Sequence, residues 1–451
     1  MPRWLRPLVP LFIAAVSAAS VVARSAPGVT FTDTRLRNGL RVIISEDRSA
    51  PVFSLAVTYN AGSRDERKGR TGFAHLFEHM MFKGSEQVGP GEHFTLIFNN
   101  GGTMNGTTSK DRTLYFEALP ANQLDLALFL EADRMWSLDI TKANLDNQRH
   151  AVQEERRLGI DNQPYGRTFE LIDELAFENF ANEHSVIGSM EDLSAATVED
   201  VAAFFKTYYA PNNAVLTIVG DVRAGDALAR VRKYFERIPS QPRPPRPDLR
   251  EPRQTAERRQ TIEDSLARLP RLDIAWHGTP PNTADDDAMT VLASVLSSGR
   301  SSRFYENLVR QKQLTSGANA FNESTRGPGL FRVLSLALPG KTIAELEAAV
   351  YAEIEKVKAG PIAAWEIEKA LNGAKRSFAA GLGSSLQRAI LLGEYALFWD
   401  DPGLINTYVS RLGKVTAADV QRVARQYLVD TRRTVVITNP KAAGDLKEGA
   451  R

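Results

Sequence analysis

The residues best suited to chemistry lie together in an otherwise apolar segment, residues 71–82, with the sequence TGFAHLFEHMMF. As a helix, this segment would be buried on most sides. Positions i and i+4 of a helix share a face, so His75 and His79 can bind one zinc ion through their imidazoles. Glu78 lies beside this pair, placed to reach a water on the metal rather than the metal itself. Three unpaired ionisable side chains in such a helix would cost several kcal/mol, which favours a metal site over ordinary core histidines.

A third protein ligand is required, and Glu155 is the candidate. Residues 145–158 (LDNQRHAVQEERRL) carry a stripe at spacings of three and four that contains Leu145, Val152 and Glu155. Glu154 lies about 100° away around the same helix. As an alternative, both acids and the arginines that follow them could form a solvated charged face. The place of Glu155 in the stripe predicts instead that it points inward, toward the metal.

The composition narrows the classes of protein and of site. The 451 residues include six histidines and no cysteine, which excludes disulfide scaffolds, zinc fingers, thiolate catalysis and iron–sulfur clusters. A transition metal would therefore be bound by histidine and carboxylate. The 56 basic and 54 acidic residues give a net charge of +2, too little for general binding to a phosphate backbone, so no nucleic-acid partner is expected. With 43% hydrophobic residues, the chain can bury a large core.

The first 23 residues have the features of a secretory signal peptide. Arg3 and Arg6 precede an uncharged apolar run at residues 8–23 that ends in small residues. The run is about 16 residues long, shorter than the roughly 20 that span a bilayer, so a retained signal anchor is the less favoured alternative. No other segment of the sequence is apolar and long enough to cross a membrane. We therefore expect the mature protein in the periplasm or secreted, with no integral membrane span.

A linker divides the rest of the chain. Residues 239–260 are rich in proline and arginine and show no apolar periodicity, which predicts an exposed linker rather than a basic docking strip. The linker separates two predicted domains, at 28–238 and 261–441, and a tail follows at 442–451.

The two predicted domains resemble each other. A capped helix at residues 193–201 and a β-branched strand at 215–219 recur at 412–420 and 434–438, with one constant offset. Residues 52–60 alternate apolar and polar, which is typical of a half-buried strand. The sequence predicts an α+β protein of two homologous domains, each an antiparallel or mixed β-sheet covered by helices.

Taken together, these motifs resemble the inverted zincins, the metallopeptidases of the pitrilysin (insulinase) superfamily. The resemblance covers nearly the whole mature chain and points to the small bacterial branch that is similar to mitochondrial processing peptidase. It rests first on H-x-x-E-H at residues 75–79, followed farther along the chain by Glu155. The further motifs are Asn-Gly-Leu at 38–40, GGTMNGTTSKDRTLY at 101–115, NQPYG at 162–166 and Ile-Gly-Ser at 187–189.

The four other histidines, His93, His150, His184 and His277, show no ligand spacing among themselves. We interpret them as surface or core residues. His184 alone stands just before a motif of the family, the Ile-Gly-Ser at residues 187–189.

The resemblance implies a zinc-dependent endopeptidase or oligopeptidase that hydrolyses unfolded peptides inside a clamshell chamber formed by two chains. His75, His79 and Glu155 would hold one zinc ion per chain, with the fourth position left for water. Glu78 would take the proton of that water during attack on the peptide carbonyl and pass a proton to the departing amine. A scaffold subunit or a non-hydrolytic peptide-binding protein of the same family is the alternative. An intact ligand set and the retained Glu78 argue against both, because binding alone needs no base.

The resemblance also implies substrate-binding residues. Asn105, Gly106 and Thr107 would provide an edge strand and polar contacts on which an extended peptide pairs its backbone. Gly106 stands where relatives usually have alanine, a small change that should keep the close backbone approach. Asn105 has an alternative role as a turn residue in a glycine-rich loop.

Three further positions depart from the pattern of the family. Gln148 stands where many relatives have a glutamate beside the zinc, which removes a negative charge and predicts modestly weaker metal binding. The second half normally contributes an arginine and a tyrosine that clamp the substrate. Here Arg310 is displaced by one position and Ser316 takes the place of the tyrosine. We therefore expect a second chain of this family to supply the clamp in a heterodimer, with a self-sufficient homodimer or a monomer as alternatives.

Overall fold

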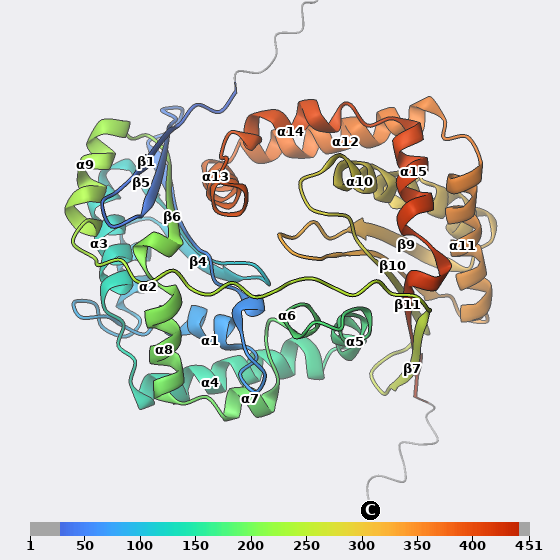
Figure 1. Ribbon diagram of the computed structural model, residues 1–451, viewed down its shortest axis with the longest axis horizontal. Coiled ribbons are helices and arrows are strands. Elements are labelled where there is room, and N and C mark those ends of the chain that lie inside the picture. Colours follow the sequence, from blue (N-terminus) through green and yellow to red (C-terminus); the bar gives the residue numbers. More distant parts are fainter. Residues whose placement is uncertain (1–27, 442–451) are drawn as a thin grey trace, which may run out of the picture.

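The first of two sheets carries the edge on which the candidate site lies. The computed structural model describes residues 28–441, so the predicted signal peptide and the tail at 442–451 lie outside the described residues. The first sheet has six strands in the order β1-β2-β6-β3-β5-β4, in which only β2 and β6 are parallel neighbours (Figure 1). The strands are β1 (Thr32–Arg35), β2 (Arg41–Glu46), β3 (Val52–Tyr59), β4 (Thr103–Thr108), β5 (Thr113–Pro120) and β6 (Ala214–Gly220).

The second sheet repeats the arrangement of β2-β6-β3-β5-β4 in the first. Its five strands lie in the order β7-β11-β8-β10-β9, in which only β7 and β11 are parallel neighbours. The starts of β3 and β8 are as far apart along the chain as the starts of β6 and β11, so the repeat in the sequence is a repeat of the fold. The predicted α+β fold of two homologous domains is confirmed. The strands are β7 (Arg258–Asp264), β8 (Arg271–His277), β9 (Thr315–Asn322), β10 (Leu330–Ala337) and β11 (Arg433–Pro440).

Several helices begin at a residue whose side chain accepts a backbone N–H of the first turn, such as Thr141 before α4 and Thr416 before α15. Within residues 28–441, no helix has both the length and the apolar character needed to cross a membrane. The helices of the first half are α1 (Phe73–Met80), α2 (Glu92–Asn99), α3 (Leu124–Trp136), α4 (Lys142–Arg156), α5 (Gly166–Ala176), α6 (Phe180–Glu183), α7 (Met190–Ser194), α8 (Val198–Tyr208) and α9 (Ala224–Phe235). Those of the second half are α10 (Ala284–Ser297), α11 (Ile343–Ala359), α12 (Ala364–Leu382), α13 (Ser385–Trp399), α14 (Leu404–Leu412) and α15 (Ala417–Tyr427).

The two halves exchange one helix each. Helix α13 of the second half packs on β3 and β6 of the first sheet, and α5 of the first half packs on β8 and β11 of the second sheet (Figure 1). The starts of α5 and α13 have the same separation along the chain as the repeated strands, so the exchange is reciprocal. The strand predicted at residues 52–60 is present as β3, but the prediction that it is half-buried is wrong for this reason, since all its residues after Val52 are buried. Ser54 and Thr58, expected to face solvent, are buried, and a Cβ at Gly393 of α13 would lie 2.8 Å from the Thr58 hydroxyl.

A buried arginine also joins the halves. Arg64 is fully buried and donates hydrogen bonds to Asp111 (2.5 Å) and Asn182 (3.0 Å) in the first half. It also donates to the carbonyl of Pro328 in the second half, at 2.5 Å. A buried charge without partners costs several kcal/mol, so Arg64 stabilises the observed arrangement of the two halves.

Between α9 and β7 the predicted linker forms no helix or strand and crosses from the first half to the second (Figure 1), whereas its last three residues, 258–260, already belong to β7. Most of its side chains are exposed. It is attached to the first half through Glu251, whose carboxylate accepts the backbone N–H groups of Glu178 and Asn179. The domain boundaries on either side of it remain a prediction.

Candidate metal centre

Helix α1 presents two imidazoles on one face. Leu76, Phe77 and Met80 are buried in the core of the first half, which fixes the rotation of the helix about its axis. His75 and His79 share another face, with their ring centroids 4.9 Å apart. The helix and its i, i+4 pair of histidines are present as the sequence predicted.

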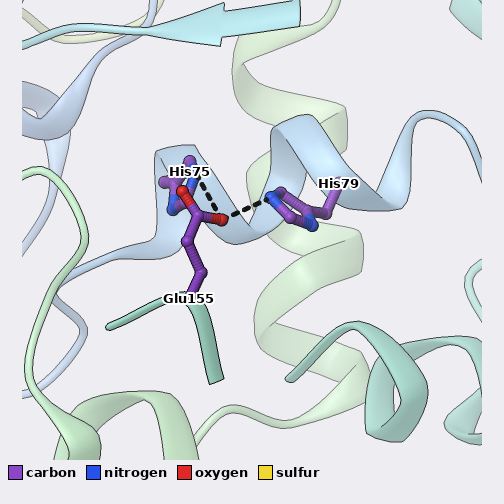
Figure 2. Close-up of side chains that lie close together, drawn as sticks. All are labelled: His75, His79 and Glu155. Atoms are coloured by element: carbon purple, nitrogen blue, oxygen red, sulfur yellow. Dashed lines mark ion pairs between the residues drawn. The ribbon is translucent and has the colours of Figure 1, made fainter. Parts of the chain in front are cut away.

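Glu155 reaches these histidines from α4. Its Oε2 atom lies 3.3 Å from Nε2 of His79 and 3.7 Å from Nε2 of His75 (Figure 2). Val152, from the same stripe of α4, is buried in the core, so the rotation that packs it also turns Glu155 toward α1. The side chain of Glu155 is 51% exposed, more than its place in an inward stripe predicted, because it leaves the core to meet the imidazoles. Glu154 instead forms an ion pair with an arginine of its own helix end.

These three side chains fit a tetrahedral zinc ion. Bonds of about 2.0 to 2.2 Å to nitrogen and carboxylate oxygen put the ligand atoms of a tetrahedron roughly 3.3 to 3.6 Å apart. The separation of 3.3 Å between Glu155 and His79 lies in this range, and the 3.7 Å between Glu155 and His75 lies just above it. One possible ligand atom from each residue lies within 4.8 Å of the others. Two histidines and one glutamate are also a known ligand set of catalytic zinc, in which the fourth position takes water.

The environment of His75 suits a metal ligand. Burial, together with the neighbouring His79, lowers the pKa of His75 to about 4, so its imidazole is neutral near pH 7. A ligand nitrogen must be free of its proton to bind a metal. Nδ1 of His75 is buried and has no hydrogen-bond partner among the described residues.

Gln148 is the residue that stands where many relatives have a glutamate beside the zinc. Its side-chain amide donates an N–H to Asn147 at 2.5 Å.

Glu78 is held against strand β4. Its Oε2 accepts a hydrogen bond of 2.5 Å from the Thr108 hydroxyl, which leaves Oε1 for other partners. Gly106 lies against the same side chain, and a Cβ there would approach Cγ of Glu78 to 2.9 Å. Burial raises the pKa of Glu78 and the Thr108 hydrogen bond opposes that rise, while the charge of Glu155 adds to it. A carboxylate with a raised pKa is better matched to general-base work near neutral pH.

Three of the four residues predicted to bind substrate, Asn105, Gly106 and Thr107, lie in β4, the last strand at one edge of the first sheet. Asn105 is therefore part of a strand, and its alternative role as a turn residue is wrong. Asn105 and Thr107 are exposed and Gly106 is buried against Glu78. Arg112, at the turn to β5, donates to both the carbonyl and the hydroxyl of Thr107 and fixes this end of the edge strand. Substrate binding by Asn105, Gly106 and Thr107 stays a prediction.

Arg310 and Ser316 lie in the second half. Arg310 belongs to a π-helical segment, Tyr305–Gln311, where it is exposed and forms an ion pair with Glu306 one turn earlier. Ser316 is exposed in β9, the edge strand of the second sheet. The structure does not bring Arg310 into contact with the His75, His79 and Glu155 cluster. Its role in substrate binding stays a prediction.

A second group of residues has the composition of a metal site but a different role. His93, Glu117 and Glu131 are buried and each offers a ligand atom within 4.8 Å of the others. Arg134, however, donates to both carboxylate oxygens of Glu131, and its guanidinium lies 4.5 Å from the ring centre of Tyr115. This side chain already supplies the positive charge that a metal ion would bring. The group is a buried ion pair joined to a hydrogen bond of 2.6 Å between His93 and Glu117.

Sequence reasoning missed Thr108 and Glu66, which hold Glu78 and the start of α1 respectively. Glu66 precedes α1 and Thr108 lies in β4, so neither belongs to the helix on which it acts and no helical spacing points to it. Thr108 stood in the motif at residues 101–115, but no role had been assigned to it. His184, interpreted as a surface or core residue, is nearly buried and contacts Glu66. Its place just before Ile-Gly-Ser was the single signal in the sequence.

Comparison with known proteins places both halves in one family. Residues 41–189 match the family described as insulinase (peptidase family M16), and residues 195–374 match the peptidase M16 inactive domain. The chain is 30% identical over 408 residues to the zinc protease PqqE of Helicobacter pylori, covering 90% of this chain and 92% of that one. It is 25% identical to a probable mitochondrial-processing peptidase subunit beta of Arabidopsis thaliana, covering 88% of this chain and 76% of that one.

A solved structure is similar to this chain over nearly its whole described length. The crystal structure of a protease from Helicobacter pylori is similar with a TM-score of 0.87 and 29% sequence identity. The match covers 91% of this chain and 100% of that one, so it includes both sheets and the exchanged helices.

Proposed function

Because this chain belongs to the insulinase family of peptidases (family M16), we propose that it is a zinc-dependent endopeptidase or oligopeptidase that hydrolyses unfolded peptides. The observation that carries the proposal is the meeting of His75, His79 and Glu155 at ligand distances, with Glu78 on the same helix as the two histidines. The relatives named as zinc proteases support it. A scaffold or a peptide-binding chamber would need neither this ligand set nor a buried carboxylate beside it.

The residues of the chain would divide the reaction among them. His75, His79 and Glu155 would hold zinc, which when bound polarises water and lowers its pKa toward about 7. Glu78 would accept the proton of the attacking water on Oε1, since Oε2 is occupied by the Thr108 hydroxyl. Glu78 would then return that proton to the departing amine. The free edge of β4 would pair with the backbone of an extended substrate, a mode that requires an unfolded segment.

The first test is whether hydrolysis depends on zinc. We expect the purified chain to bind about one zinc ion and to cut a quenched peptide library, because the ligand set is complete within one chain. A strong chelator should abolish cutting, and zinc should restore it while magnesium does not, since magnesium prefers octahedral oxygen ligands. Elemental analysis and fluorescence report the two quantities. Cutting that continues after the zinc has been removed would refute the proposal.

We also propose that a second chain of this family completes the site as a heterodimer. Ser316 stands in β9 where relatives have the clamp tyrosine, and Arg310 is paired with Glu306. Weak hydrolysis by the pure chain is therefore expected to rise about tenfold or more when a tyrosine-bearing relative from the same source is added. The matched control is that relative with its tyrosine changed to phenylalanine. Full activity of the pure chain would instead favour a self-sufficient homodimer or monomer.

The apolar run at residues 8–23 supports a further part of the proposal, a periplasmic or secreted location. Substrates would then be peptides and unfolded segments in that compartment. Cleavage of a stably folded domain as fast as a short peptide would contradict this choice of substrate.

A further inference from the structure

The helix that carries the two histidines is capped from outside its own sequence. Gly72, its N-cap residue, has a φ of +82° and no side chain with which to bind the free N–H groups of the first turn. Glu66 takes this role: its Oε2 accepts the N–H of Gly72 at 2.9 Å and its Oε1 that of Ala74 at 2.7 Å. A negative charge at a helix N-terminus is also favoured by the helix dipole. Both oxygens of Glu66 are thus engaged at the turn just before His75.

Glu66 has a fully buried side chain, and His184 is its titratable neighbour. Nε2 of His184 lies 3.0 Å from Oε2 of Glu66, with side chains 8% and 0% exposed. The imidazole also stacks on the ring of Phe180, with centroids 4.4 Å apart. A buried carboxylate without a countercharge would be protonated and would cap the helix less well. A protonated His184 would supply this countercharge, in addition to the backbone N–H groups of Gly72 and Ala74 that also favour the ionised carboxylate.

The hydrogen bonds of His184 indicate its protonation state. Nδ1 lies 2.5 Å from the carbonyl oxygen of Phe180, and Nε2 lies 2.8 Å from the carbonyl oxygen of Ser63 as well as close to Glu66. The two carbonyl oxygens can only accept hydrogen bonds. A neutral imidazole has one nitrogen without a proton, and that nitrogen would face an oxygen lone pair at hydrogen-bond distance. Both ring nitrogens must therefore carry a proton.

We propose that His184 is a buried imidazolium that keeps Glu66 ionised at the start of α1 and thereby positions His75 and His79 for zinc. It is a positioning residue, since the described contacts connect it to the ligands only through Glu66 and the helix backbone. Groups that orient metal ligands typically contribute about 10- to 100-fold to metal affinity. The inference rests on the proposed zinc site, but its two parts can be tested separately.

The charge of His184 is tested on the unaltered, metal-free protein. The chain has six histidines, so labelling them with ¹⁵N gives a spectrum simple enough to assign, with His184→Gln identifying one set of signals. At pH 8 we expect both ring nitrogens of His184 to be protonated, because each faces a carbonyl oxygen that can only accept a hydrogen bond. A single protonated nitrogen on His184 would overturn the proposal. The protonation state is read from the unaltered protein and does not depend on zinc binding, and the variant serves only to assign the signals.

The positioning effect is tested by zinc affinity. Competition with a chelator should show binding to His184→Gln weakened about tenfold or more, while His150→Gln, on the exposed face of α4, binds zinc as the wild type does. Circular dichroism identifies folded samples, and Glu66→Gln serves as a second variant with the same expected loss. Unchanged affinity in either folded variant would overturn the proposal. If the wild type itself bound no zinc, the proposed function would fail instead, and the ¹⁵N spectrum would still decide the charge of His184.

Discussion

Glu78→Gln is expected to retain zinc and to lower kcat for peptide hydrolysis about a thousandfold, within the range found for loss of a general base. Glutamine has nearly the same shape, and its amide oxygen can still accept the Thr108 hydrogen bond. It cannot accept a proton from water, so the chemical step is lost while the ligands remain. Zinc content by elemental analysis, and kcat and KM on a quenched peptide, measure the two properties independently.

The control for this variant is Glu86→Gln, which changes an exposed glutamate soon after α1 and should leave hydrolysis unaltered. Residual activity of Glu78→Gln near that of the wild type would show that another group takes the proton. If the wild type and Glu78→Gln both bound zinc and neither cut peptides, the first explanation would be the absence of the clamp tyrosine, whose place Ser316 takes. Addition of the partner chain would then separate an incomplete enzyme from a non-hydrolytic relative.

Glu155→Ala is expected to bind zinc about a hundredfold more weakly than the wild type, or weaker still. Loss of a direct ligand should cost more than the roughly 10- to 100-fold seen when only an outer partner of a ligand is removed. The variant also leaves two imidazoles, one of them largely buried, without their negative neighbour. Chelator competition gives the affinity, and hydrolysis at a fixed low zinc concentration should fall in parallel.

The neighbouring residue provides a matched control. Glu154→Ala removes the same group one position earlier on α4, where the side chain is exposed and paired with Arg157. An exposed pair of this kind contributes little to stability, so zinc affinity and hydrolysis should stay close to those of the wild type. Equal losses from Glu154→Ala and Glu155→Ala would mean that the helix, rather than the ligand, had been damaged. If Glu155→Ala bound zinc as tightly as Glu154→Ala does, Glu155 would not be a zinc ligand.

The sequence by itself determined the parts of this protein that depend on local spacing. The i, i+4 spacing of His75 and His79 and the stripe containing Glu155 follow from 3.6 residues per turn, which any helix at those positions must obey. The constant offset between the repeated segments likewise predicted two similar domains. These features could be predicted because each requires only that a segment form its preferred secondary structure.

Only the tertiary structure decided how the site is held. The exchange of α5 and α13 buried Ser54 and Thr58, which local alternation had predicted to face solvent. The cap formed by Glu66 depends on His184, far along the chain, and the orientation of Glu78 depends on Thr108 in another element. Such contacts join segments that lie far apart in the sequence and meet only in the folded chain. Their free energy depends on burial and geometry, which leave no periodic pattern in the sequence.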